Sequence, residues 1–183
     1  MVSIGILGLG NWGSAIAKMW LDEGHKVKGW TIESEVYESI TMDNINHKYL
    51  PKLSLKGMDV SMHIADTLEG VECVVRSVPS SVILEVVDQV IPHLRPRHVL
   101  LDLAKGLAPD NQMISHAIQE KLIAANMTNP LAVVTGPTIA PEAAAGVMTT
   151  ALVASEDVAV ANKLAKTLTT QTFILHPASD PVG

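Results

Sequence analysis

The segment Ile4-Gly5-Ile6-Leu7-Gly8-Leu9-Gly10-Asn11-Trp12-Gly13 decides the fold of this chain. An apolar run ends in three glycines spaced G-x-G-x-x-G, and an amphipathic segment follows, which is the strand, turn and helix order of a dinucleotide-binding site. Gly8 can adopt the backbone angles of a tight turn, Gly10 leaves room for a pyrophosphate, and Gly13 lets the helix lie close to the strand. The start of the helix adds free N–H groups and the positive end of its dipole.

The residues around the glycine turn support this interpretation. Val2 to Leu7 form an apolar run, as expected of a strand covered on both faces, and the next segment repeats apolar residues at helical spacing until Gly24. A second strand is expected over residues 26–31. Glu33 follows it, 20 residues after Gly13, where an acidic side chain would accept hydrogen bonds from the adenosine ribose.

The rest of the chain alternates between expected strands and helices. Strands are expected over residues 59–64, 71–78, 98–103, 131–135, 148–154 and 172–175, and helices over residues 34–40, 65–70, 82–90, 109–125, 138–145 and 156–168. Ser80, Ser81 and Thr138 are expected helix caps, and residues 41–55 an irregular polar excursion. This order predicts an α/β fold with a doubly wound, mostly parallel sheet of Rossmann type, as a single dinucleotide-binding domain over residues 1–183.

Composition excludes several classes of function. The chain has 183 residues, 48% of them apolar, and a formal net charge of −6 without a basic stripe, so neither nucleic acid nor a membrane surface is an expected partner. No signal peptide and no apolar run of roughly 20 residues is found. Cys73 is the only cysteine, in an apolar run, and the seven histidines are dispersed, so we expect an inert thiol, no disulfide, no metal site and a cytoplasmic setting.

Polar residues that follow the expected strands are candidates for a site, because a doubly wound sheet binds ligands beyond the carboxyl ends of its strands. Pro79 would offer a flat apolar surface to a cofactor, or would simply end a strand. Lys105 would place a positive charge in the crevice, suited to a phosphate or a developing oxyanion, or would be a solvated loop lysine. A third turn and the excursion add further candidates: Gly136, which shapes the turn, and the polar residues Thr138, Glu142, Asn44, His47, Lys48 and Tyr49.

Taken together, these segments resemble the NAD(P)-dependent glycerol-3-phosphate dehydrogenase family. The resemblance rests on the glycine turn with Trp12, on Val78-Pro79-Ser80, on Lys105-Gly106-Leu107, and on Gly136-Pro137-Thr138-x-Ala140-x-Glu142, with Tyr49-Leu50-Pro51 as a further match. It implies hydride exchange between a nicotinamide cofactor, NAD or NADP, and the pair dihydroxyacetone phosphate and sn-glycerol 3-phosphate, within glycerophospholipid metabolism. It also implies that the full-length protein is a homodimer.

The resemblance assigns roles to individual residues. Lys105 would be catalytic and would contact both cofactor and substrate, while Gly136 and Thr138 would hold the phosphorylated substrate. The cofactor would contact Gly8, Gly10, Asn11, Trp12, Gly13, Glu33, Tyr49, Pro79, Lys105, Ala140 and Glu142.

The chain departs from the family pattern in three places. The helical second domain, with the proton-transferring lysine, would begin where residues 180–183 end the chain, so we expect a cofactor-binding half with little or no turnover. The run Trp30-Thr31-Ile32-Glu33 has an acid where the family commonly has a base, which predicts NAD(H) over NADP(H) unless Lys28 or a basic residue of the excursion substitutes. Arg76 lies inside an otherwise apolar strand without an evident reason.

Two alternatives stay open on the sequence. One is a non-catalytic dinucleotide sensor or partner module, which a reading frame ending at Gly183 would favour. The other is a dehydrogenase of a related hydroxy-acid class, against which the Lys-Gly and Gly-Pro-Thr segments count.

Overall fold

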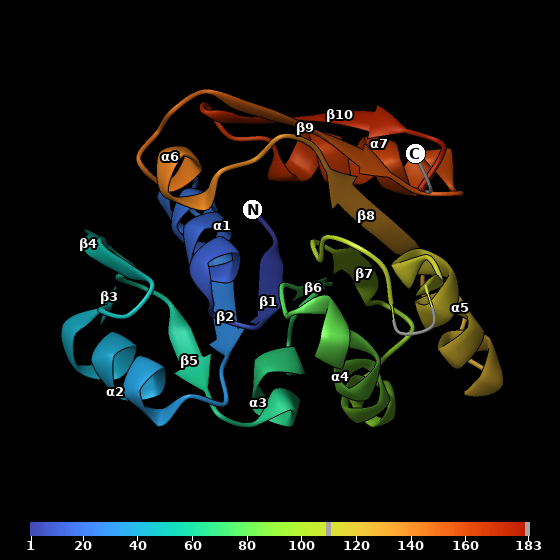
Figure 1. Cartoon of the computed structure of the whole chain (residues 1–183), viewed down its shortest axis with the longest axis horizontal. Coiled ribbons are helices and arrows are strands. Elements are labelled where there is room, and N and C mark those ends of the chain that lie inside the picture. Colours follow the sequence, from blue (N-terminus) through green and yellow to red (C-terminus); the bar gives the residue numbers. More distant parts are fainter. Residues whose placement is uncertain (109–110, 182–183) are drawn as a thin grey trace.

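The computed structural model describes residues 1–108 and 111–181. Eight strands form one sheet in the order β10-β9-β8-β7-β6-β1-β2-β5 (Figure 1). Neighbouring strands are parallel, except that β8 and β9 are antiparallel. This confirms the doubly wound, mostly parallel sheet. The strands are β1 (Ser3–Leu7), β2 (Lys26–Trp30), β5 (Asp59–Ser61), β6 (Cys73–Arg76), β7 (Val99–Asp102), β8 (Leu131–Thr135), β9 (Thr149–Ala154) and β10 (Phe173–Ala178).

Helices cover both faces of the sheet, as its largely apolar strands require. On one face lie α1 (Asn11–Asp22), α6 (Ala140–Ala144) and α7 (Val158–Leu168), and on the other lie α3 (Ile64–Leu68), α4 (Ile83–Val90) and α5 (Ile114–Ala124). The indole N–H of the fully buried Trp20 donates a hydrogen bond to the carbonyl of Leu168, which joins α1 to α7.

The excursion over residues 41–55 is more regular than expected. Helix α2 (Ser34–Asp43) continues beyond residue 40 and ends at Asn44, which adopts a left-handed conformation with φ 56°. An antiparallel hairpin of β3 (Ile45–Asn46) and β4 (Leu50–Ser54) follows, apart from the main sheet. Its polar, partly exposed strands lack the alternation of apolar and polar residues by which a hairpin is usually recognised in a sequence.

Several expected boundaries and caps were wrong. Two turns of 3₁₀ helix, Ser80–Val82 and Ile91–His93, flank α4, which begins after Val82 without a side-chain cap, so Ser80 and Ser81 do not cap it. Likewise α6 begins after Ile139, not at Thr138. Helix α5 starts at Ile114, because Leu107 and Met113 first form an isolated bridge; Pro109, the expected first residue, lies outside the described residues, as do residues 182–183.

Arg76 has a buried counterion. It ends β6 directly beside Asp102 at the end of β7, both side chains are at most 2% exposed, and Nε lies 3.9 Å from Oδ1. Asp102 also accepts a hydrogen bond from the N–H of Ala104. No nitrogen of the guanidinium has a hydrogen-bond partner among the described residues. Burial raises the pKa of the Asp102 carboxyl, and Arg76 opposes that shift.

Breaking this pair from one side should cost more stability than removing it altogether. We expect Arg76→Met or Asp102→Leu to lower the free energy of unfolding by about 3–5 kcal/mol, because each leaves an uncompensated buried charge. The double variant should recover most of this loss. Urea unfolding of the four proteins measures both effects, and single variants as stable as the parent would show that the pair does not behave as a buried ion pair.

Two buried histidines should make stability depend on pH. His25 and His98 accept backbone N–H bonds through Nδ1, from Val2 at 3.2 Å and from Arg95 at 3.0 Å, which requires that nitrogen to be unprotonated. Burial lowers the pKa of both imidazoles below the usual 6.5. The unfolded chain therefore binds more protons than the folded one as pH falls through 6.5, and stability is lost there.

Chemical unfolding at about pH 8 and about pH 5.5 should show this loss. A variant with both His25→Gln and His98→Gln should lose less stability on acidification than the parent. His116→Gln, a change at an exposed histidine, should keep the parent's dependence.

Candidate functional site

A cavity of about 790 Å³ opens beyond the carboxyl ends of β1, β2, β6 and β7. The chain runs from β1 to β2 toward one edge of the sheet, while β6 and β7 extend toward the other. The cavity therefore lies at the switch point of the sheet, where doubly wound folds bind their ligands.

Most of the residues singled out in the sequence meet in this cavity. Its lining includes Gly8, Gly10, Asn11, Trp12, Glu33, Tyr49, Pro79, Lys105, Thr138 and Ala140. Of the residues to which the resemblance assigns a role, three lie outside this lining, and the excursion candidates Asn44, His47 and Lys48 also lie outside it. Gly13 lies under the glycine turn, Gly136 lines a neighbouring cavity of about 320 Å³ that Lys105 also borders, and Glu142 is exposed in the first turn of α6.

The three glycines of the turn have different functions. Gly8 has φ +100°, and a Cβ there would lie 2.6 Å from the carbonyl oxygen of Ser77. A Cβ on Gly13 would lie 1.9 Å from the carbonyl oxygen of Gly8. A Cβ on Gly10, by contrast, would meet no other heavy atom of the described residues within 4 Å. Gly8 and Gly13 are thus required by the fold, while Gly10 leaves space open toward the cavity.

The amino end of α1 suits an anion. Gly10 precedes the helix in an extended conformation, and no side chain of the described residues caps the helix. Its first N–H groups therefore remain available at the cavity wall, where Asn11 and Trp12 lie, together with the positive end of the helix dipole. These groups fit the pyrophosphate of a dinucleotide.

Asn46 ties the β3–β4 hairpin to the glycine turn. Its side chain is fully buried, and Nδ2 donates to the carbonyl of Leu9 and to Oγ of Ser14, each at 2.9 Å. Its Oδ1 accepts the N–H of Tyr49 at 3.1 Å. This contact fixes the hairpin so that Tyr49 lines the cavity. The sequence alone did not single out Asn46 for this position, although it lies three residues before Tyr49-Leu50-Pro51.

Glu33 is held as an anion at the β2 end of the cavity. The hydroxyl of Tyr49 donates to Oε1 at 2.9 Å, and the ammonium of Lys48 donates to Oε2 at 2.5 Å. The bond from Lys48 lowers the pKa of Glu33, and the bond to Glu33 raises the pKa of Tyr49. The carboxylate is therefore oriented, with lone pairs left for further donors.

Lys105 lies at the β7 end of the cavity. Its ammonium donates to the carbonyl of Thr138 at 3.1 Å, so it bridges the loop after β7 and the segment before α6. One face of the segment leading into and along α4 also lines the cavity wall. The sequence analysis missed these residues, although their spacing of three, four and seven is helical: Val82, Glu85, Val86 and Gln89.

The lining is mostly apolar, and among the described residues that form it only Glu33, Glu85 and Lys105 are charged. Lys28 does not reach it, because its ammonium donates to the carbonyl of Asp66 at 3.0 Å and lies 4.0 Å from Asp59.

Cys73 is buried, as expected, and burial raises the pKa of its thiol to about 12. Within the described residues, no group of three His, Cys, Asp or Glu side chains could hold a metal ion, and no helix is long and apolar enough to cross a membrane.

Gly10 and Gly13 form a matched pair for testing the turn. Gly10→Val should fold, since space is open there, but should weaken NADH binding at least about tenfold by obstructing the pyrophosphate. Gly13→Val should instead lower stability by about 3 kcal/mol, because the new side chain meets backbone. Titration followed by the fluorescence of Trp12 and Trp30, together with urea unfolding, separates the two effects. Parental NADH affinity in Gly10→Val would contradict this placement of the pyrophosphate.

Comparisons with known proteins identify one family. A family model described as NAD-dependent glycerol-3-phosphate dehydrogenase N-terminus matches residues 3–161. Glycerol-3-phosphate dehydrogenases [NAD(P)+] from Syntrophotalea carbinolica and Anaeromyxobacter dehalogenans are each 32% identical, over 100% and 97% of this chain and 55% and 54% of theirs. The crystal structure of glycerol-3-phosphate dehydrogenase from Coxiella burnetii superposes with a TM-score of 0.88 at 28% identity, over 98% of this chain and 54% of that one. The chain thus spans about half the length of these relatives.

Proposed function

Since the chain belongs to the NAD-dependent glycerol-3-phosphate dehydrogenase family, of which it matches the N-terminal part, we propose that it is the cofactor-binding half of such an enzyme. The whole protein would interconvert dihydroxyacetone phosphate and sn-glycerol 3-phosphate, within glycerophospholipid metabolism. The observation that carries the proposal is the switch-point cavity, which brings together the glycine turn, Glu33 and Lys105.

The cavity suits an extended dinucleotide. The pyrophosphate would lie against Gly10 and the amino end of α1, and the adenosine ribose would reach Glu33 and Tyr49. The other half of the cofactor would then extend past Pro79 toward Lys105. When bound, the nicotinamide supplies or accepts the hydride that interconverts the carbonyl and alcohol carbons of the substrate.

Lys105 is the catalytic candidate of this half. Its positive charge would stabilise the substrate oxygen or phosphate beside the cofactor, with Gly136 and Thr138 holding the substrate. Its present acceptor, the carbonyl of Thr138, lies on the cavity wall, so the ammonium already points to the segment expected to hold the substrate. Ala140 lines the same wall, and Glu142 would have to reach the cofactor from the exposed side of α6.

Glu33 favours NAD over NADP. Its carboxylate can accept bonds from both ribose hydroxyls but repels a 2′-phosphate, and Lys28, one cation considered as a substitute, is engaged elsewhere. The names of the relatives include both NAD and NADP. The preference of this chain between the two cofactors must therefore be measured.

Titration of the purified chain with NADH, NADPH and dihydroxyacetone phosphate, singly and in pairs, tests the proposal. We expect NADH to bind, NADPH to bind at least about tenfold more weakly, and NADH to be consumed slowly or not at all when dihydroxyacetone phosphate is added. Absence of NADH binding would refute the proposal, and tighter NADPH binding would refute the preference. Steady turnover at rates typical of enzymes would show that this half is catalytically complete.

The alternative of a dinucleotide sensor predicts the same binding. The two hypotheses differ in the expected effect of Lys105→Met. If the chain is a sensor, this substitution should leave NADH binding unchanged. In a dehydrogenase, the same change should abolish any effect of dihydroxyacetone phosphate on NADH binding.

A further inference from the structure

Lys48 lies between two carboxylates at the edge of the candidate cofactor site. Its ammonium donates to Oε2 of Glu33 at 2.5 Å and also bonds Oε1 of Glu35. An ammonium has three protons, so one donor remains after these two bonds. The cluster of Glu33, Glu35 and Lys48 has a formal charge of −1, where two carboxylates without the lysine would have −2.

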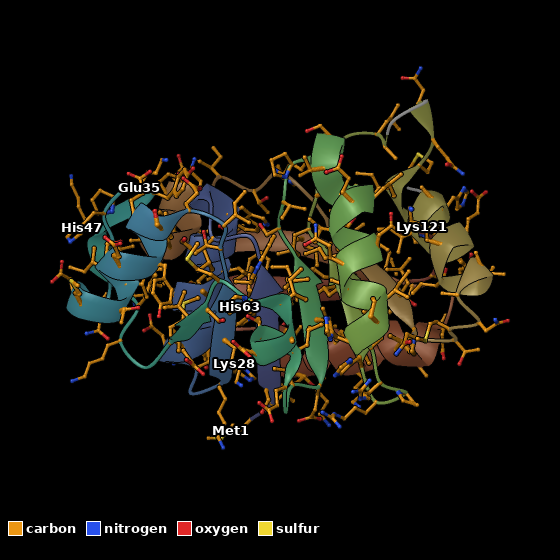
Figure 2. The ribbon with its side chains drawn as sticks, turned by 90° about the horizontal axis from the view of Figure 1, so that it is seen from below. Met1, Lys28, Glu35, His47, His63 and Lys121 are labelled. Carbon is orange, nitrogen blue, oxygen red and sulfur yellow. The ribbon has the colours of Figure 1, made fainter. Side chains whose placement is uncertain are left out.

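The hairpin holds this lysine in place. Asn46 fixes the turn to Leu9 and Ser14 by buried hydrogen bonds, and the ammonium of Lys48 lies 5.5 Å from the centre of the Tyr49 ring. Figure 2 shows Glu35 and the neighbouring His47 at one end of the molecule, while Lys28 lies well away from them. Lys48 is thus the cation beside Glu33, and Lys28 is not.

We propose that Lys48 determines the choice between NADH and NADPH by changing its partner. The inference rests on the proposed function. With NADH, Lys48 stays on Glu33 and keeps the carboxylate turned so that both oxygens can accept from the ribose hydroxyls. With NADPH, Lys48 leaves Glu33 and pairs with the 2′-phosphate, which would otherwise meet two carboxylates.

The properties of the side chain suit this exchange. Lysine carries a compact charge on a flexible stem, and the side chain of Lys48 is 43% exposed, so it can move without disturbing the core. Exposed ion pairs add little to the stability of a folded protein. If the cluster had only a structural role, replacing Lys48 would therefore change the free energy of unfolding very little. Because Lys48 lies close to the expected position of the adenosine ribose, we expect replacing it to change cofactor binding more than folding.

Two substitutions, alone and combined, test the proposal through the dissociation constants of NADH and NADPH. Lys48→Met should raise the ratio of the NADPH constant to the NADH constant about tenfold, the effect of losing one charge-assisted hydrogen bond to phosphate. Glu33→Gln should tighten NADPH binding about tenfold, because it removes repulsion and frees Lys48. In the double variant, most of that gain should be lost.

Lys52→Met is the matched control. Lys52 is an exposed lysine on β4 of the same hairpin. Its replacement by Met removes one positive charge, as Lys48→Met does, but at a residue outside the cluster of Glu33, Glu35 and Lys48. We expect its NADPH to NADH ratio to match the parent's within about twofold. A ratio in Lys48→Met that equals the control's would overturn the proposal, as would a gain in Glu33→Gln that persists in the double variant.

These outcomes differ from failure of the proposed function. If the parent chain binds neither NADH nor NADPH, the cofactor site itself is refuted. If the parent binds NADH and the ratio responds equally to Lys48→Met and Lys52→Met, the cofactor site stands and only the role of Lys48 falls. Urea unfolding of each variant confirms that the compared proteins are folded.

Discussion

The close packing of Gly13 against the carbonyl of Gly8 is the constraint on which the site depends. No side chain can enter there, since a Cβ would lie 1.9 Å from that oxygen. The packing brings the first turn of α1 onto the end of β1, so its uncapped N–H groups face the cavity. The carbonyl of the next residue, Leu9, then accepts from Ser14 and Asn46, so the same turn also anchors the hairpin. One backbone contact thereby positions both the amino end of α1 and Tyr49.

The chain uses two clusters of opposite charges in different ways. Arg76 and Asp102 are buried within the sheet, where separation of the two charges costs much and the pair is fixed. Lys48 and its two carboxylates lie in partial contact with water, where changing partners costs little. The first cluster supports the loop that carries Lys105, through the bond from Ala104 to Asp102, while the second is the one proposed to respond to a bound cofactor.

The sequence predicted the features that depend on local rules. The glycine spacing, the apolar strands and the alternation of elements gave the sheet, and residues placed after strands met in the cavity because parallel strands end at one edge. Long-range contacts were not predictable in this way. Asn46 reads as one more polar residue until its partners across 37 and 32 positions are known. The counterion of Arg76 depends on the register of β6 against β7. The face of α4 was missed because most of its residues are exposed and two of them, Glu85 and Gln89, are polar, as on the solvent face of any amphipathic helix.

The two ends of the cavity are built with unequal rigidity. At the glycine turn, Nδ2 of the buried Asn46 donates to both Leu9 and Ser14, so the turn proposed to hold the pyrophosphate is fixed before a ligand arrives. At the other end, Lys105 to Leu107 are exposed, and one hydrogen bond joins Lys105 to Thr138. Preformed groups contribute affinity without a cost of ordering, whereas exposed groups must be ordered by what covers them. In the proposed function, the glycine turn is therefore the rigid end of the cofactor site, and the role proposed for Lys105 depends on what orders Lys105 and its neighbours.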